Sequence, residues 1–512
     1  MRALITPHVF PPSPSAGTLR VPASKSHTIR RLLLASLTEG VSRVEGPLDS
    51  LDTRSCAAAC RILGARITED RDGGVLRGWT VEGRNASGAS GPSGPGRLID
   101  TGNSGTTLFL ALAAAALGSS PVTFTGDEQI ARRGAGPLLE ALEGLGVRVD
   151  SSPGPGGKTG YIPVTVCGPW KGGRVSLPCP TSQYLSALLV AAPLAPAGTV
   201  TEIDVPLLNE KPYVEMTLAY LAAQGLYRGP DKSGAVDKSG AVGGIAAGTA
   251  ANGSPGSVEA AADFSFFRIR GGGAYRPVNG PVPGDFSSAA FPAAAAAISG
   301  GALTLRGLDP ADTQGDRVFF EYLAALGREV RWDTGSAAGP AVTVSRRGPD
   351  SQGIPDSQGI LRGGVFDLNA TPDMLPVMAV LASYAEGETA LVNAAHARIK
   401  ETDRIAVMAA ELRKLFGGAP GFRCEEQPGG LVIRGAGAAL RGGGGGHNRG
   451  RGEHPPGRII ALDGRGDHRV VMALACAALA LPAGTAAEIA GAEAADVTYP
   501  GFLELLEARC YS

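Results

Sequence analysis

Residues 284–306 read GDFSSAAFPAAAAAISGGALTLR, and this stretch contains the pattern that decides the fold. A polar start leads into an alanine-rich apolar run, then glycine, then a short stretch of alternating apolar residues. Asp and Ser favour the start of a helix, glycine favours its end, and alternation favours a strand. The stretch therefore predicts a buried helix over Ala289–Ser299 that leads into a strand.

The same pattern occurs six times along the chain. The other five predicted buried helices are Arg30–Glu39, Thr107–Leu117, Tyr184–Pro196, Met374–Glu386 and Val470–Pro482. A more amphipathic helix follows each β-like run, as in RVFFEYLAALGREV (317–330). Alanine-rich helices pack closely, so several can be buried inside a ring of strands. Because single cores are limited in size, we expect an α/β fold with two domains of three repeats each.

Four glycine-rich segments interrupt the repeats. They lie near 84–97, 228–258, 347–360 and 434–458, and two of them contain tandem copies of DKSGAV or PDSQGI. Few apolar residues are present to offset the entropy of ordering them. We expect these segments to be solvated inserts that take no part in catalysis. The chain of 512 residues contains 75 glycines, but 43% of it is hydrophobic, so the rest of the chain can form a core.

Composition excludes several classes of function. The chain has 47 Lys and Arg against 48 Asp and Glu, which disfavours a broad nucleic-acid or membrane surface. Seven scattered cysteines do not suggest a disulfide framework, and Cys56 and Cys60 lack a second pair for a metal. The start of the sequence, MRALITPHVFPPSP, lacks an apolar stretch of signal-peptide length, and the longest apolar runs, such as 470–483, are too short to span a bilayer. We expect a cytoplasmic monomer with no nucleic-acid or membrane partner.

Polar residues gather at the predicted starts of the buried helices. These stretches read SKSHTIR (24–30), DTGNSGTT (100–107), PTSQ (180–183), GDFSS (284–288), NATPD (369–373) and GDHR (466–469). Capping explains the Ser, Asp and Asn residues, but it does not require Lys25, Arg30, Gln183, His468 or Arg469. Helix N-termini bind anions. The pattern predicts a strongly cationic site for a small polyanionic ligand in an otherwise neutral protein.

The segment 396–416, HARIKETDRIAVMAAELRKLF, adds charged groups. Its spacing predicts that Lys400 and Arg404 share a helix face with Glu401 beside them. Two interpretations stay open: a surface ion-pair cluster, or groups that transfer protons together with Asp373 and Lys25. No catalytic triad, phosphate-binding loop or dinucleotide fingerprint is present.

From about residue 18 to 508, the motifs of this chain resemble those of a known family. LRVPASKSHTIRRLLLASLTEG, GNSGTT, SQYLSALLVAAPLA, KPYVEMTL, GDFSSAAF, QGD, RIKETDRIAVMAAELRKL and DHRVVMALA follow one another in this order. The chain resembles the 5-enolpyruvylshikimate-3-phosphate synthases of the enolpyruvyl transferase family. The resemblance implies transfer of the enolpyruvyl group of phosphoenolpyruvate to the 5-hydroxyl of shikimate 3-phosphate, with release of phosphate. It implies addition followed by elimination, in the shikimate pathway, with no metal or organic cofactor.

The resemblance also implies the architecture, a two-domain inside-out α/β barrel. Each domain would contain three βαβαββ-type repeats with buried parallel helices. The first domain would comprise residues 1–22 and 281–512, and the second residues 23–280.

The resemblance further implies the residues of the site. Shikimate 3-phosphate would be held by Lys25, Ser26, Arg30, Thr181, Ser182, Gln183, Tyr213, Asp373 and Lys400. Phosphoenolpyruvate would be surrounded by Lys25, Asn103, Gly105, Gln183, Arg404 and Arg469. Asp373 would accept the proton of the 5-hydroxyl. Glu401, with Lys25 nearby, would transfer protons at the phosphoenolpyruvate carbons.

Five positions depart from the common pattern of the family. Phe109 and Gln129 stand where Arg is frequent, Glu210 where Ser is usual, His396 where Asn is usual, and Val497 where Lys is common. Arg132 or Arg133 could take the place of the Arg absent at 129. Three alternatives remain: a catalytically impaired member acting as a binding protein, a UDP-N-acetylglucosamine enolpyruvyl transferase, and an RNA 3′-phosphate cyclase.

Overall fold

The computed structural model describes most of the chain. The described residues are 1–6, 17–83, 96–157, 159–229, 254–337, 339–346, 360–437, 440, 458–482 and 484–510. The four predicted inserts lie mostly outside them. The chain divides into two compact units, one comprising Met1–Ser24 with Pro283–Ser512 and the other Lys25–Val282.

The unit Lys25–Val282 contains three four-stranded sheets of one topology, in which the first two strands are parallel and the others antiparallel. The first sheet has the order β14 (Gly280–Pro281), β3 (Gly40–Glu45), β5 (Val75–Gly83), β4 (Arg66–Asp72). The second is β6 (Arg97–Asp100), β7 (Val122–Thr125), β9 (Tyr161–Cys167), β8 (Arg148–Ser152). The third is β10 (Gly173–Ser176), β11 (Val200–Asp204), β13 (Phe266–Arg270), β12 (Val258–Ala260).

Helices alternate with these strands along the chain. The alanine- and leucine-rich helices are α1 (Lys25–Ser36), α3 (Gly105–Ala115) and α5 (Gln183–Ala191). The helices that follow them are α2 (Leu51–Ile62), α4 (Gly136–Gly144) and α6 (Lys211–Ala223). All of α3 is buried, and the starts of α1, α3 and α5 carry the polar residues singled out in the sequence.

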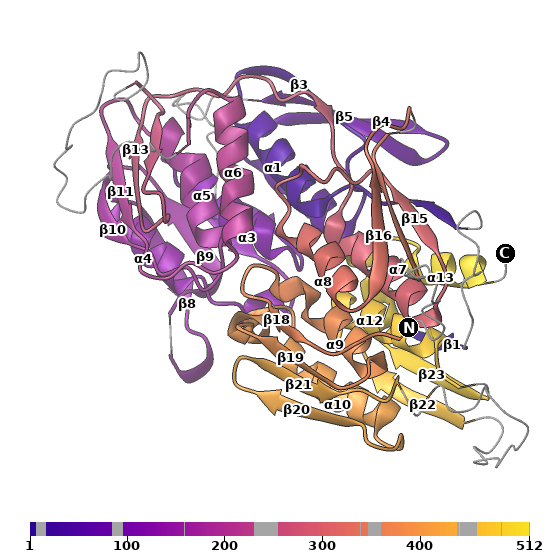
Figure 1. Cartoon of the computed structure of the whole chain (residues 1–512). Helices are drawn as coiled ribbons and strands as arrows, with labels where there is room; N and C mark the ends of the chain where they lie inside the picture. Colours follow the sequence, from indigo (N-terminus) through magenta and orange to yellow (C-terminus); the bar gives the residue numbers. More distant parts are fainter. Residues whose placement is uncertain are drawn as a thin grey trace, which may run out of the picture. The chain divides into compact units, whose positions relative to one another are not determined.

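The other unit has two four-stranded sheets of the same topology and a third sheet of three strands. Its sheets have the orders β16–β17–β15–β2, β18–β19–β21–β20 and β1–β23–β22. These strands are β1 (Arg2–Ile5), β2 (Thr18–Arg20), β15 (Leu303–Arg306), β16 (Arg328–Asp333), β17 (Ala341–Arg346), β18 (Val365–Asp367), β19 (Glu388–Val392), β20 (Arg423–Gln427), β21 (Gly430–Arg434), β22 (Arg458–Asp463) and β23 (Thr485–Ala490). Its helices are α7 (Phe286–Ser299), α8 (Phe319–Ala325), α9 (Leu375–Tyr384), α10 (Arg404–Phe416), α12 (His468–Leu479) and α13 (Phe502–Cys510). Figure 1 labels most of these elements.

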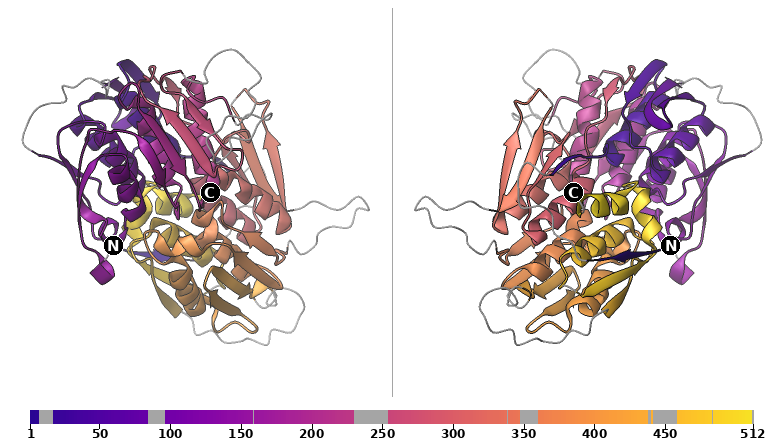
Figure 2. Two further views of the ribbon diagram at one scale, coloured as in Figure 1. Left: turned by 90° about the vertical axis from the view of Figure 1, so that its left-hand side faces the viewer. Right: turned by 90° about the vertical axis from the view of Figure 1, so that its right-hand side faces the viewer.

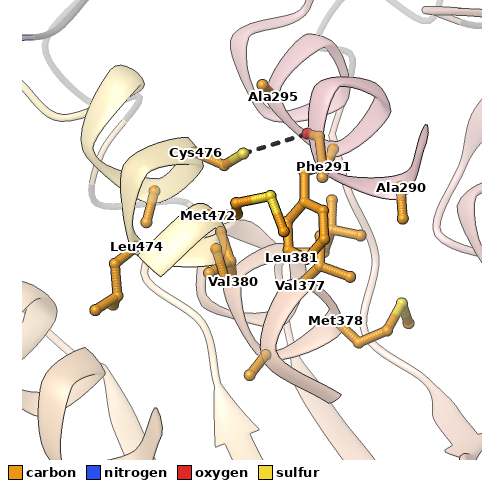
Figure 3. Packing of buried hydrophobic residues seen from close by; sticks show 14 of the residues in the cluster. Ala290, Phe291, Ala295, Val377, Met378, Val380, Leu381, Met472, Leu474 and Cys476 are labelled. Atoms are coloured by element: carbon orange, nitrogen blue, oxygen red, sulfur yellow. Dashed lines mark hydrogen bonds between the residues drawn. The ribbon is translucent and has the colours of Figure 1, made fainter. Parts of the chain in front are cut away.

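The core of this unit is made by α7, α9 and α12, which pack against one another. All residues of α9 and α12 are buried, as alanine and leucine allow close packing on every side. Phe291 of α7 lies among Val377, Leu381 and Met472, and its carbonyl oxygen accepts a hydrogen bond from Cys476 Sγ at 3.3 Å (Figure 3). The strands of each unit surround such helices (Figure 2). The predicted α/β class with buried helices is therefore confirmed.

Two strands show where the chain passes between the units. β2 precedes α1 in the chain but pairs in parallel with β15, with Leu19 opposite Leu305. β14 precedes α7 but pairs in parallel with β3, with Gly280 opposite Val44. Each of these strands thus completes a sheet of the unit that the chain is about to leave.

Five of the six buried helices begin earlier than the sequence predicted, the exception being α9. The prediction of Arg30–Glu39 followed the apolar run, whereas α1 starts at Lys25; likewise α7 starts at Phe286. Asp285 caps α7 by accepting a hydrogen bond from the Ser288 amide, so the polar residues form its first turn. Among the described residues, no helix is long and apolar enough to cross a membrane.

Candidate functional site

The starts of α1, α3 and α5 lie at one end of the unit Lys25–Val282. Lys25 Nζ is 3.0 Å from Asp52 Oδ2, which connects α1 to α2. The Asp52 carbonyl oxygen accepts a hydrogen bond from Thr107 Oγ1 of α3 at 3.5 Å. Gln183 Nε2 of α5 donates to Thr106 Oγ1 of α3 at 3.1 Å. Residues from three separate sequence motifs, together with Asp52, are thereby brought together.

Arg30 connects the same end of α1 to α5 and α6. Its guanidinium donates to the Ser26 and Tyr213 carbonyl oxygens, each at 3.2 Å, to Thr217 Oγ1 at 2.9 Å and to Ser186 Oγ at 3.4 Å. The residue is only 2% exposed, and burial lowers its pKa to about 10, so it remains charged at neutral pH. The implied contact between Arg30 and substrate stays a prediction; its bonds within the unit fix the turns that carry Ser26 and Tyr213.

The loop before α5 bonds to a carboxylate. Glu210 Oε2 accepts hydrogen bonds from Thr181 Oγ1 at 3.0 Å, from the Ser182 amide at 3.1 Å and from Ser182 Oγ at 3.0 Å. Glu210 is buried and precedes α6 in the left-handed region, with φ 57° and ψ 39°. Two residues expected to hold shikimate 3-phosphate, Thr181 and Ser182, are therefore already bonded to an internal anion.

The glycine at the start of α3 makes room for a cation. A Cβ atom on Gly105 would lie 2.5 Å from Arg133 Nη1 and 3.5 Å from Gln183 Oε1. Arg132 instead is exposed, with Nη2 3.7 Å from Glu128 Oε2. Of the two arginines weighed as replacements at position 129, Arg133 is the one beside Gly105.

Asn103 and Phe109 occupy the same region. Asn103 Nδ2 donates to Gln129 Oε1 at 2.5 Å, so Gln129 orients the Asn103 amide. Phe109 packs edge-to-face on Tyr184, with ring centroids 5.0 Å apart. The Tyr184 hydroxyl donates at 2.5 Å to the carbonyl oxygen of Gly134, next to Arg133.

In the other unit, Arg404 is the centre of an ion-pair cluster. Its Nε donates to Asp467 Oδ2 at 2.8 Å, and its Nη1 to Asp373 Oδ1 at 2.6 Å. Its Nη2 donates to Glu401 Oε2 at 2.5 Å. Although burial lowers the pKa of Arg404, the three carboxylates raise it well above its usual value. With 1% of the Arg404 side chain exposed, the surface interpretation of the 396–416 segment is wrong.

Lys400 and Arg404 do not share a helix face, which corrects the sequence prediction. α10 begins at Arg404, while Lys400 has φ −85° and ψ −151° outside it. Asp403 causes the late start because its carboxylate accepts a hydrogen bond from the Ala406 amide at 3.0 Å and so caps the helix. The loop 400–403 brings Lys400 Nζ to 3.9 Å from Asp373 Oδ1.

Asp373 lies among three cations. Besides Arg404 and Lys400, Arg469 Nη2 approaches Asp373 Oδ2 to 2.9 Å. Burial alone would raise the pKa of Asp373, but the surrounding positive charges hold it well below its usual value. The Asp373 side chain is 19% exposed, so it is reachable from solvent. In this state it is a stable carboxylate and a weak base.

Sequence reasoning missed several carboxylates. Asp467 caps α12 through the Arg469 amide at 2.9 Å while it pairs with Arg404. Asp316 is buried and accepts a hydrogen bond from Ser287 Oγ. Burial, with the charge of Asp373, raises the pKa of Asp316 to about 6. The sequence had singled out QGD (314–316) and GDHR (466–469) as motifs without giving their aspartates a role.

These carboxylates change the predicted electrostatics. The sequence predicted donors and cations at the helix starts, whereas the structure matches Lys25, Arg404 and Arg469 each with a carboxylate partner. Within the described part of the chain, no group of His, Cys, Asp and Glu side chains is arranged to hold a metal ion.

Comparison with known proteins assigns both units, and with them the site residues of each, to one family. The sequence model of "EPSP synthase (3-phosphoshikimate 1-carboxyvinyltransferase)" matches residues 9–227 and 255–506, and so includes both units. The chain belongs to the EPSP synthase family. A relative named 3-phosphoshikimate 1-carboxyvinyltransferase from Acetivibrio thermocellus is 40% identical over 97% of this chain and 96% of its own length.

Other members of the EPSP synthase family agree. A relative of the same name from Halobacterium salinarum is 38% identical over 97% of this chain and 96% of its own length. The solved EPSP synthase of Acinetobacter baumannii has a TM-score of 0.67 with coverage of 99% of this chain and 98% of its own. Its sequence identity is 24%, so this structure supports the fold.

Proposed function

We propose that this protein transfers the enolpyruvyl group of phosphoenolpyruvate to the 5-hydroxyl of shikimate 3-phosphate. This is the 3-phosphoshikimate 1-carboxyvinyltransferase reaction of the shikimate pathway, which leads to chorismate and the aromatic amino acids. The family match across both units carries the proposal. Retention of Lys25, Asp373 and Glu401, each held by an ion pair, supports it further.

In the unit Lys25–Val282, the proposed role is recognition of shikimate 3-phosphate. Thr181 and Ser182 offer hydroxyl and amide donors that match phosphate oxygens. Ser26, Gln183 and Tyr213 would contact the same substrate. Arg30 would act as a positioning residue, since its guanidinium joins the turns that carry Ser26 and Tyr213.

For phosphoenolpyruvate, the proposed ligands are Arg404 and Arg469 with the loop at 103–105. Guanidinium groups bind carboxylate and phosphate through paired hydrogen bonds. Arg133 would add the charge absent at Gln129, because its Nη1 lies against Gly105. Lys25 and Gln183 would complete this set.

Proton transfer at the 5-hydroxyl depends on the charges around Asp373. Phosphoenolpyruvate brings negative charge to Arg404 and Arg469, the cations that lower the pKa of Asp373. Binding would therefore raise that pKa and make Asp373 a better base when the substrates are in place. Asp373 would take the 5-hydroxyl proton while that oxygen bonds to C2 of phosphoenolpyruvate.

The remaining steps complete the reaction. Glu401, together with Lys25, would deliver a proton to the phosphoenolpyruvate C3 as C2 is attacked. Collapse of the tetrahedral intermediate expels phosphate, and the C3 proton returns to the protein. The fixed positive groups would stabilise the charge that develops. Lys400 would bind the ring hydroxyls of the shikimate substrate.

We further propose a cytoplasmic monomer. All the proposed site residues come from one chain, so a second copy supplies none of them. The six cysteines whose side chains are described are buried thiols outside disulfides, as suits a reducing compartment.

The decisive experiment supplies purified protein with both substrates and measures phosphate release. Release that requires both substrates, with formation of 5-enolpyruvylshikimate 3-phosphate by mass spectrometry, is the expected result. Binding of shikimate 3-phosphate without turnover would favour a non-catalytic binding protein. Neither binding nor turnover would overturn the proposed function.

A further inference from the structure

One carboxylate oxygen occupies the donors that are proposed for the substrate phosphate. Glu210 Oε2 accepts hydrogen bonds from two hydroxyls and one backbone amide of Thr181 and Ser182, all between 3.0 and 3.1 Å. Several donors that converge on one anionic oxygen are what a bound phosphate oxygen also requires. A carboxylate and a phosphate oxygen cannot share this position.

We propose that Glu210 is a specificity-determining residue that competes with the phosphate of the substrate for Thr181 and Ser182. In the substrate-free protein the carboxylate satisfies these donors. When a phosphate monoester binds, its oxygens replace the carboxylate and the Glu210 side chain turns away. This inference rests on the proposed function, because the proposed function places the phosphate at Thr181 and Ser182.

The backbone holds Glu210 in this arrangement. A residue other than glycine in the left-handed region is disfavoured by roughly 1 kcal/mol or more, yet Glu210 adopts φ 57°. Its carbonyl oxygen accepts a hydrogen bond from the Tyr213 amide at 3.0 Å, which fixes the first turn of α6. The strained turn keeps the carboxylate next to the loop before α5, 28 residues away in the chain from Ser182.

Because Glu210 is buried, its competition with the substrate phosphate should be measurable as a change in affinity. The carboxylate of Glu210 is buried, and a buried charge is stable only when hydrogen-bonded or paired. Its charge also favours the protonated form of Arg30. A phosphate must displace a carboxylate that is already well bonded, so the affinity for the phosphorylated substrate is lower than the donors alone would give. Unphosphorylated shikimate leaves Glu210 in place and gains nothing from its removal.

Two substitutions of Glu210 separate the effect of its charge from the effect of its side-chain shape. Glu210→Gln keeps the length and an acceptor oxygen but removes the charge. Glu210→Gly removes the side chain and suits the positive φ. Glu202→Gln is the matched control, because Glu202 lies on β11 and pairs with Arg268 at 2.9 Å. Thermal unfolding of each variant shows whether it folds.

The first measurement is the affinity for shikimate 3-phosphate by calorimetry, with the KM of each substrate. We expect both Glu210 variants to bind it more tightly than wild type, on the order of tenfold for Glu210→Gly. The KM of phosphoenolpyruvate and the affinity for unphosphorylated shikimate should change less than about twofold. Unchanged or weaker binding of shikimate 3-phosphate by both folded variants would overturn the proposal, as would equal gains for unphosphorylated shikimate.

The second measurement uses inorganic phosphate alone and does not depend on the proposed function. Calorimetry should give tighter binding of phosphate by Glu210→Gly than by wild type and Glu202→Gln. Equal phosphate binding in all three proteins would contradict the role of Glu210. Tighter phosphate binding in a protein that neither binds nor converts shikimate 3-phosphate would keep the role of Glu210 and reject the proposed function instead.

Discussion

Arg404 and Asp467 form a buried ion pair, with Nε and Oδ2 2.8 Å apart, that joins the first turn of α10 to the cap of α12. The two residues are 63 positions apart in the chain. Asp467 pairs with Arg404 and also accepts hydrogen bonds from the first backbone amides of α12. The pair thus fixes two residues expected to bind phosphoenolpyruvate, Arg404 itself and the adjacent Arg469.

Asp467→Asn should lower the free energy of unfolding by about 3 kcal/mol, because removing one partner leaves a buried guanidinium less well compensated. Asn remains a good helix cap, so the loss reports the ion pair. Urea denaturation measures it. Asp463→Asn is the control: Asp463 pairs with the exposed Arg465 at 3.0 Å, and its loss should change stability by less than about 1 kcal/mol. Equal effects in the two variants would contradict the assignment.

Asp373→Asn and Glu401→Gln should each lower kcat by at least about a hundredfold while the protein stays folded. Both amides keep the shape of the carboxylate but cannot accept and return a proton. Stopped-flow phosphate release measures the rate, and calorimetry with shikimate 3-phosphate shows whether binding survives. Near-normal rates in a folded variant would refute the proton-transfer role of that residue. Glu425→Gln, at an exposed position of β20, serves as a control with wild-type rates.

The fold could be predicted because its signals are local. Each apolar run is bounded by its own capping residues and glycine, so the six buried helices are visible in short stretches of sequence. Prediction was poorer at helix starts, where polar first turns such as 25–30 belong to the helix. It failed at Lys400 because the capping by Asp403, rather than the charge spacing, decides where α10 begins.

The partners of the site residues could not be predicted. Ion pairs and hydrogen bonds such as Lys25 with Asp52 or Glu210 with Ser182 join the start of a buried helix to the start of the helix that follows it in the same repeat. No helical or strand periodicity relates such residues, so the sequence identified the cations, Asp373 and Glu401 but not Asp52 and Asp467, which pair with Lys25 and Arg404. Glu210 was visible only as a departure from the common pattern of the family, and its hydrogen bonds explain its importance.

Folding raises the pKa of Asp316 but lowers that of Asp373, so the two groups should make stability depend on pH in opposite directions. The pKa of Asp316 rises from 3.8 to about 6 on folding, so the folded state binds the proton more tightly between these values. The free energy of unfolding therefore falls as pH rises from about 4 to about 6, by about 3 kcal/mol from this group. Asp316→Asn lacks this titration. Its stability relative to wild type, from urea denaturation, should rise by that amount between pH 4 and pH 7, and a constant difference would contradict the shift.

Arg133 and Arg132 are neighbours in the chain, but we expect their substitutions to have different effects on the KM of phosphoenolpyruvate. Arg133→Ala should raise the KM of phosphoenolpyruvate on the order of tenfold, because its guanidinium lies against Gly105 and such a group binds anions by charge-assisted hydrogen bonds. Arg132→Ala should leave it unchanged, since Arg132 is exposed and pairs with Glu128. Steady-state kinetics with each substrate varied in turn distinguish the two. If Arg133 supplies the charge absent at position 129, Gln129→Arg in the Arg133→Ala background should restore part of the affinity for phosphoenolpyruvate. A KM that rises equally in both single variants would instead indicate a general effect of net charge.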